Sequence, residues 1–138
     1  MKYEMISIRT TIKKYKITHP FLLDQFLKRY TKSRQEQFLV ITLDGAHQVI
    51  GIHIATIGLN NMTVVHPREV FIHAIRDNAA AIITAHNHPS NNTKPSDNDL
   101  QVARMLTDAG EIIGIRVIDH LIITKDDYLS FKKDEIVF

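Results

Sequence analysis

The segment from residue 79 to residue 99 constrains this chain most, because a short apolar run leads there directly into two closely spaced histidines. The run at 79–85 has the length and composition of a buried strand, and it delivers the chain to His86 and His88. A polar loop follows, and Ser96 then begins a pattern of apolar residues at helical spacing. A buried strand, a loop and an amphipathic helix in succession predict helices packed on a sheet.

The rest of the chain extends this pattern with further strands and helices. The expected strands cover 5–9, 38–43, 49–54, 79–85, 115–124 and 128–131. The expected helices cover 20–30 and 65–78, and a third begins at Ser96 and ends at Gly110 or Gly114. This order predicts an α/β (α+β) fold, with a mixed β-sheet flanked by helices. The length of 138 residues fits a single domain over 1–138.

Composition excludes several other classes of protein. The chain has no cysteine, so disulfides and thiolate metal sites are ruled out. Its formal net charge of +2 is too small to argue for nucleic-acid binding by itself. The first residues lack the apolar core of a signal peptide, and no apolar run approaches the roughly 20 residues that span a bilayer. We therefore expect a cytoplasmic protein without membrane contacts.

Three residues in the 79–99 segment are ligand types that zinc accepts. His86 and His88 lie two apart, so both imidazoles point to the same side of an extended segment. Asp99 adds a carboxylate in the first turn of the helix, and a catalytic zinc site typically has three protein ligands. Taken alone, Ser96-x-x-Asp99 is a helix-start pattern, and an isolated H-x-H is more often structural. Their combination favours a site for one zinc ion, and Ser96 can both cap the helix and line the pocket.

The pattern H-x-H-P, six residues, S-x-x-D resembles the JAMM motif of the JAB/MPN metalloprotease superfamily. The flanking sequence is similar to the RadC branch over roughly residues 36–131. The resemblance implies a JAB/MPN domain, whose layered architecture is similar to that of cytidine deaminases. Full-length RadC proteins usually carry a helix-hairpin-helix domain, which we do not expect in this short RadC-like chain. The family usually has glycine after Ser90, where this chain has Asn91, a residue that tolerates left-handed backbone.

The resemblance also implies roles for individual residues. His86, His88 and Asp99 would be the zinc ligands, and Ser96 would help to bind the charged intermediate. The family uses a glutamate before a central strand, and Glu36 fits that place, although the sequence alone favours a solvated charge. JAMM enzymes hydrolyse peptide or isopeptide bonds. The expected function is therefore a zinc-dependent metallopeptidase or isopeptidase that acts on a peptide or protein substrate.

Other histidines and carboxylates rank lower as functional residues. Asp119 and His120 could supply a carboxylate or a hydrogen bond to a metal ligand, but a structural role within a strand is the more common one for such a pair. His53 and His73 are expected to be surface residues or hydrogen-bonded core residues.

A DNA-associated accessory module is the alternative function. Two basic groups could contact DNA, although a solvated face is their more common meaning: Lys13, Lys14 and Lys16, then Lys28, Arg29, Lys32 and Arg34. The letters of residues 86–88 spell HNH, but in HNH nucleases these letters stand for residues far apart. A zinc deaminase would need H-x-E and P-C-x-x-C, which are absent. Exposed edge strands would allow a homodimer.

Overall fold

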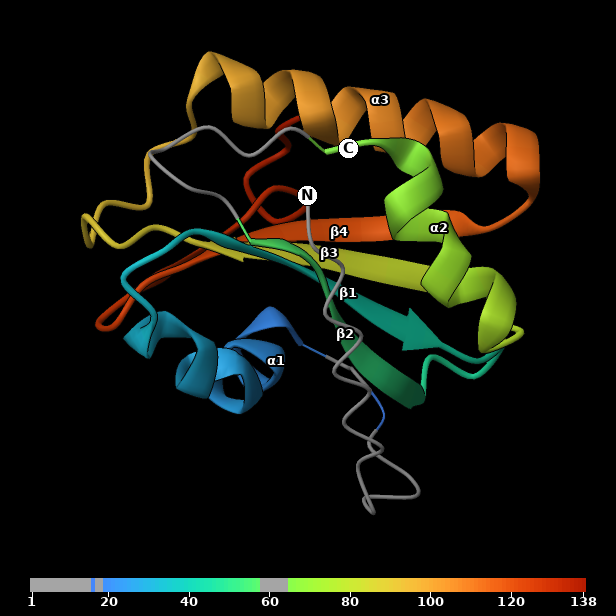
Figure 1. The fold of residues 1–138 in the computed structure, drawn as a ribbon, viewed down its shortest axis with the longest axis horizontal. Helices are drawn as coiled ribbons and strands as arrows, with labels where there is room; N and C mark the ends of the chain where they lie inside the picture. The colour runs from blue at the N-terminus through green and yellow to red at the C-terminus, as the bar shows by residue number, and fades with distance from the viewer. Residues whose placement is uncertain (1–15, 17–18, 58–64) are drawn as a thin grey trace.

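The computed structural model describes residues 16, 19–57 and 65–138. Within these residues, five strands form one mixed sheet in the order β2-β1-β3-β4-β5 (Figure 1). The strands are β1 (Gln37–Leu43), β2 (Val49–Ile57), β3 (Ala81–Asn87), β4 (Arg116–Ile123) and β5 (Tyr128–Ser130). β3 and β4 run parallel, and the other neighbouring pairs are antiparallel. The predicted mixed α/β fold is confirmed, while the strand expected at 5–9 lies outside the described residues.

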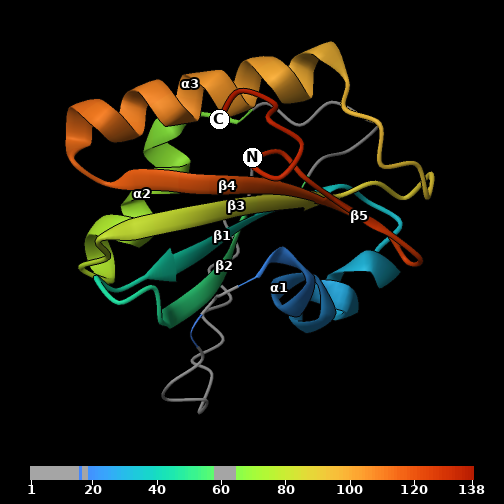
Figure 2. The same cartoon turned by 180° about the vertical axis from the view of Figure 1, so that it is seen from behind.

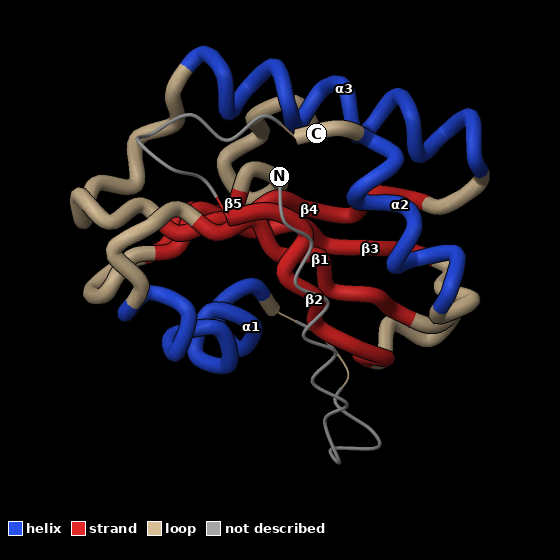
Figure 3. The backbone as a smooth tube through the Cα atoms, viewed as in Figure 1, coloured by secondary structure: helices blue, strands red, loops and turns tan. Residues whose placement is uncertain are grey.

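Helices cover both faces of this sheet (Figures 2 and 3). α1 (Pro20–Leu27) lies on one face, and α2 (Pro67–Arg76) and α3 (Asp97–Ile113) lie on the other. α3 is the crossover that a parallel pair such as β3 and β4 requires. In the part of the chain that the structure describes, no helix has the length and apolar character needed to cross a bilayer.

The sheet divides the core into two layers. Leu27 of α1 packs against one face, and Phe71 of α2 and Leu106 of α3 pack against the other. Every residue of β3 is buried, and so is every residue of β1 after the first. A central strand covered on both faces is expected to be a continuous apolar run, which is the pattern seen at 38–43 and 81–85.

The first helix is shorter than its apolar spacing predicts. It is α-helical only to Leu27 and continues as a 3-10 turn over Lys28–Lys32. In this turn Lys28 Nζ donates to the carbonyl oxygens of Thr124 and Asp127, at 2.8 and 3.1 Å. Lys28, one of the basic residues considered for DNA contact, therefore ties the turn to the β4–β5 connection. Of the other basic group, Lys13 and Lys14 lie outside the described residues.

The two glycines near the end of α3 have different roles. The helix continues to Ile113, and Gly114 ends it with a φ of 83°, a left-handed conformation that favours glycine. Gly110 lies inside the helix, where an added Cβ would collide with the carbonyl oxygen of Ile115. Gly114 therefore makes the turn, and Gly110 permits the chain to return closely past the helix into β4.

Candidate metal centre

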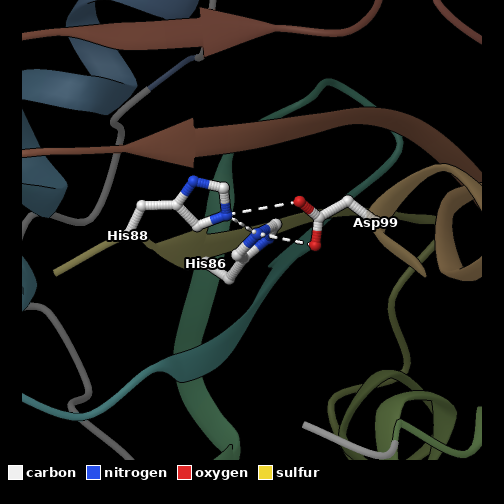
Figure 4. A group of neighbouring side chains, drawn as sticks. All are labelled: His86, His88 and Asp99. Atoms are coloured by element: carbon white, nitrogen blue, oxygen red, sulfur yellow. Dashed lines mark hydrogen bonds and ion pairs between the residues drawn. The ribbon is translucent and has the colours of Figure 1, made fainter. Parts of the chain in front are cut away.

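β3 positions the histidine pair at one end of the sheet. The strand continues beyond the apolar run, because it pairs with β1 as far as His86 and with β4 as far as Asn87. His86 is therefore only 5% exposed within the sheet, and His88 follows directly after the strand. Alternate residues of an extended segment face the same side, and both imidazoles lie beside the Asp99 carboxylate (Figure 4).

The start of α3 supplies that carboxylate. Ser96 is the N-cap, and its Oγ accepts a hydrogen bond from the Asp99 N–H at 3.1 Å. Asp99 Oδ2 in turn accepts a hydrogen bond from the Ser96 N–H at 2.8 Å, which completes a capping box. The cap orients the Asp99 side chain, and the same carboxylate still faces both histidines. The helix-start pattern and the metal-ligand pattern are therefore compatible.

Three potential ligand atoms converge between β3 and α3. His86 Nε2 lies 3.2 Å from Asp99 Oδ1, and His88 Nε2 lies 3.3 Å from Asp99 Oδ2. The two Nε2 atoms are 2.8 Å apart, and the three residues offer ligand atoms within 4.8 Å of one another. Two imidazoles and a carboxylate at this spacing could hold a metal ion.

The outer nitrogens of both imidazoles are hydrogen-bonded, which leaves the inner nitrogens for a metal. His88 Nδ1 lies 2.7 Å from the Asn92 carbonyl oxygen, which can only accept, so Nδ1 carries the proton. His86 Nδ1 lies 2.8 Å from His120 Nε2, and His120 Nδ1 lies 2.6 Å from Thr84 Oγ1. A proton on His86 Nδ1 and another on His120 Nδ1 satisfy both of these contacts. His86 Nε2 then keeps a free lone pair. Two lone pairs and a carboxylate then face one another, an arrangement that a cation stabilises.

The pKa values describe the alternative state, in which protons on the Nε2 atoms of His86 and His88, instead of a metal ion, face the Asp99 carboxylate. Burial alone would raise the pKa of Asp99, but hydrogen bonds from His86 and His88 outweigh it and hold that pKa well below its usual range. Burial lowers the pKa of His88, but hydrogen bonds to Asp99 and to the Asn92 carbonyl raise it above its usual value. Burial and the neighbouring His86 hold the pKa of His120 well below its usual value, so His120 is neutral and can accept.

Glu36 lies in the cavity beside the ligand atoms. The residue immediately precedes β1 and is half-buried. The cavity has a volume of about 20 Å³, room for about one water molecule. Carboxylates, imidazoles, one amide and apolar side chains line it: Glu36, Phe38, Val65, His86, Asn98, Asp99, Val102 and His120. Ser96 is not among the described residues that line this cavity.

A larger cavity, of about 750 Å³, lies at the other end of α3, beside Gly110 and Gly114. None of the candidate site residues is among the described residues that line it. Cavity volume therefore does not identify the candidate site in this protein. The convergence of potential ligand atoms beside the smaller cavity identifies it better.

The two candidate residues of β4 point to opposite faces, as neighbours in a strand do. His120 faces the candidate metal centre and contacts His86. Asp119 faces away, where its Oδ2 accepts from the Ser130 hydroxyl at 2.6 Å and its Oδ1 accepts from the Lys132 N–H at 2.9 Å. Asp119 therefore has the structural role considered the more common one, because this carboxylate anchors β5 and the residues after it, and the alternative of support for a metal ligand does not apply to it.

Two contacts of the site were not foreseen from the sequence. Thr84 contacts His120, and the signal for it was its position two residues before His86 in the same strand. Asn92 contributes only its backbone carbonyl, which no pattern of residue types could indicate. The neighbouring Asn91 has a φ of 64°, which confirms that this asparagine adopts the left-handed backbone expected at a family glycine.

Comparison with known proteins identifies the family. Residues 17–136 match the family described as the RadC-like JAB domain. The chain belongs to this RadC family. Among its RadC relatives, a UPF0758 protein of Methanospirillum hungatei is 55% identical over 98 residues, which cover 71% of this chain and 44% of that relative. A UPF0758 protein of Alkaliphilus oremlandii is 39% identical over 133 residues, which cover 96% of this chain and 57% of the relative.

This RadC chain spans about half the length of the curated relatives it matches. Family membership confirms the resemblance inferred from the histidine and serine–aspartate patterns. The names of the relatives state no reaction. Family and geometry together establish a RadC-like JAB domain with a His–His–Asp group that could bind a metal.

Proposed function

We propose that this protein is a zinc-dependent metallohydrolase that cleaves a peptide or isopeptide bond. The supporting observation is the convergence of His86, His88 and Asp99, whose ligand atoms lie within 4.8 Å of one another. Glu36 lines the cavity that His86 and Asp99 also line. Two imidazoles and one carboxylate are a ligand set of catalytic zinc sites, in which a fourth position holds water. The RadC-like JAB domain family is compatible with such a hydrolase.

The proposed mechanism assigns proton transfer to Glu36. His86, His88 and Asp99 would hold the zinc, which when bound would act as a Lewis acid and lower the pKa of its water far below that of bulk water, to about 7. The Glu36 carboxylate accepts the proton of the attacking water and then donates it to the leaving amine, so it serves as general base and then as general acid. Phe38, Val65 and Val102 line the same cavity and limit the access of bulk water to this transfer.

Ser96 and His120 complete the proposed site. Ser96 Oγ accepts the Asp99 N–H, and its own hydroxyl proton is left to be donated to the substrate oxygen as negative charge develops there. One such donor typically contributes about 3 to 4 kcal/mol to the transition state. His120 holds His86 in the tautomer whose Nε2 faces the metal position, and loss of such a partner typically lowers metal affinity about 10- to 100-fold.

The test compares Glu36→Gln and His88→Ala with the wild type. The readouts are bound zinc per chain and cleavage of an internally quenched peptide library. Glu36→Gln is expected to keep the zinc and to lose hydrolysis by about 100-fold or more, because general base catalysis contributes about 10² to 10⁴. His88→Ala is expected to lose the zinc. Glu111→Gln, at an exposed position beside the larger cavity, is the matched control and should change neither readout.

Three outcomes would contradict parts of this proposal. Wild-type activity in Glu36→Gln would remove Glu36 from the mechanism. A wild-type protein that binds no zinc when zinc is supplied in excess would refute the metal site. A protein that binds zinc, cleaves no peptide and binds DNA in a salt-dependent manner would support the accessory function instead.

A further inference from the structure

β1 and β3 stop pairing at the point where Glu36 approaches the metal centre. Their antiparallel register ends with Phe38 opposite His86. Continued by one and two residues, the same register would place Gln37 beside Asn87 and Glu36 beside His88. On the side of β3, the segment that carries Glu36 therefore reaches the cavity without ladder support, while Gln37 still pairs with Ile57 of β2. Any support from β3 at this point must come from a side chain.

The side chain of Asn87 supplies that support. Its Oδ1 accepts a hydrogen bond from the Gln37 N–H at 2.6 Å. Its Nδ2 donates to the Gln35 carbonyl oxygen at 3.0 Å and, at a longer 3.4 Å, to the Ser33 carbonyl oxygen. One carboxamide thus binds the backbone on both sides of Glu36. Asn87 is only 1% exposed, so water does not compete freely for these hydrogen bonds.

The chemistry of the carboxamide matches this task. Asparagine offers an acceptor oxygen and two N–H donors in one plane, so it can satisfy an N–H and a carbonyl at the same time. Asn87 also lies between His86 and His88 in the chain, and its own backbone belongs to β3. The strand that presents the two imidazoles therefore also fixes the backbone that presents the carboxylate.

We infer that Asn87 is a positioning residue, which holds Glu36 at a set place beside the metal ligands. The inference rests on the proposed function, because it concerns the residue to which we assign proton transfer. It gives the residue between the two histidines a role of its own. Misplacement of a reacting group by about 1 Å can cost about 100-fold in rate, so a backbone clamp at this point has a direct effect on chemistry.

The experiment uses Asn87→Ala and Asn87→Thr, with Gln35→Ala as the matched control. Threonine suits a strand but is too short to bond both Gln35 and Gln37, so this second variant guards against a folding defect. Gln35→Ala removes an exposed side chain from the same segment and leaves its bonded carbonyl in place.

The first readout is amide hydrogen exchange in the metal-free protein. Both Asn87 variants are expected to speed exchange at the Gln37 amide at least tenfold, while the ladder amides of β1 keep their protection. Gln35→Ala should leave both unchanged. Unchanged exchange at Gln37 in the Asn87 variants, or equal loss of protection throughout β1, would overturn the inference, because Asn87 would then not hold this segment or would be needed for the whole sheet.

The second readout is a double-mutant cycle with Glu36→Gln, measured as binding of acetohydroxamate to the zinc-loaded protein. This probe chelates zinc and offers a proton to a neighbouring carboxylate. Glu36→Gln and Asn87→Ala are each expected to weaken the binding of acetohydroxamate about tenfold or more. The zinc affinity of each variant should stay within about twofold of the wild type. The double variant should bind acetohydroxamate no more weakly than Glu36→Gln alone. Additive losses would overturn the inference. Failure of the wild type to bind zinc would refute the proposed function, while the exchange at Gln37 would still decide whether Asn87 holds the segment.

Discussion

His73 is a buried imidazole whose protonation is expected to limit the stability of the fold in acid. The side chain is 1% exposed, and its ring stacks on His53 with the centroids 4.6 Å apart. Among the described residues, neither ring nitrogen of His73 has a hydrogen-bond partner, so the expectation of a hydrogen-bonded core residue is wrong here. Burial first, then the charges of His53 and Arg76, lower the pKa of His73 from 6.5 to about 4, while Asp77 opposes the change.

The direction of the effect follows from which state binds the proton. Between about pH 6.5 and pH 4 the unfolded chain protonates His73 and the folded chain does not, so stability is complete above this window and falls as the pH drops through it. The difference between the pKa values of 6.5 and about 4 corresponds to about 3 kcal/mol in total. Roughly 2 kcal/mol of this is lost between about pH 7 and pH 5.

The assay is urea unfolding of the wild type and His73→Leu at these two pH values. Leucine has a similar volume and no nitrogen to protonate, so the variant should lose about 2 kcal/mol less unfolding free energy than the wild type on acidification. His47→Asn is the control, because it removes an exposed imidazole at a φ of 59° that asparagine tolerates. Parallel losses in the wild type and His73→Leu would refute the reasoning.

Three further predictions concern packing, capping and the metal. Gly110→Ala should lower the unfolding free energy by about 1 to 3 kcal/mol, because its Cβ meets the Ile115 backbone, whereas Gly45→Ala, with open space around it, should have little effect in the same denaturation assay. Ser96→Ala should cost about 1 kcal/mol in that assay, because the Asp99 N–H loses its cap. Removal of zinc by EDTA should lower the Tm by about 10 °C if zinc was present at about 100 times its Kd, and His88→Ala should show no such change by calorimetry.

The sequence predicted elements best where local rules decide them. The continuous apolar runs gave the central strands, and Ser96 with Asp99 gave the start of α3 together with its capping box. It predicted boundaries less well. β3 extends through His86 because both neighbouring strands supply backbone partners there, and such partners are invisible in the segment itself. The choice between Gly110 and Gly114 also depended on where β4 returns past the helix.

The candidate metal ligands could be named from the sequence because they are close together in it. Two histidines at strand spacing and a carboxylate in the next helix turn need only strand and helix geometry to share one side. The contacts around them depend on the order of strands in the sheet. Asn87 bonds the backbone on both sides of Glu36 because β1 lies beside β3, and His120 reaches His86 because β4 lies on the other side. Local backbone preferences cannot specify such neighbours, since burial of apolar residues on both faces of the sheet determines which strands pair.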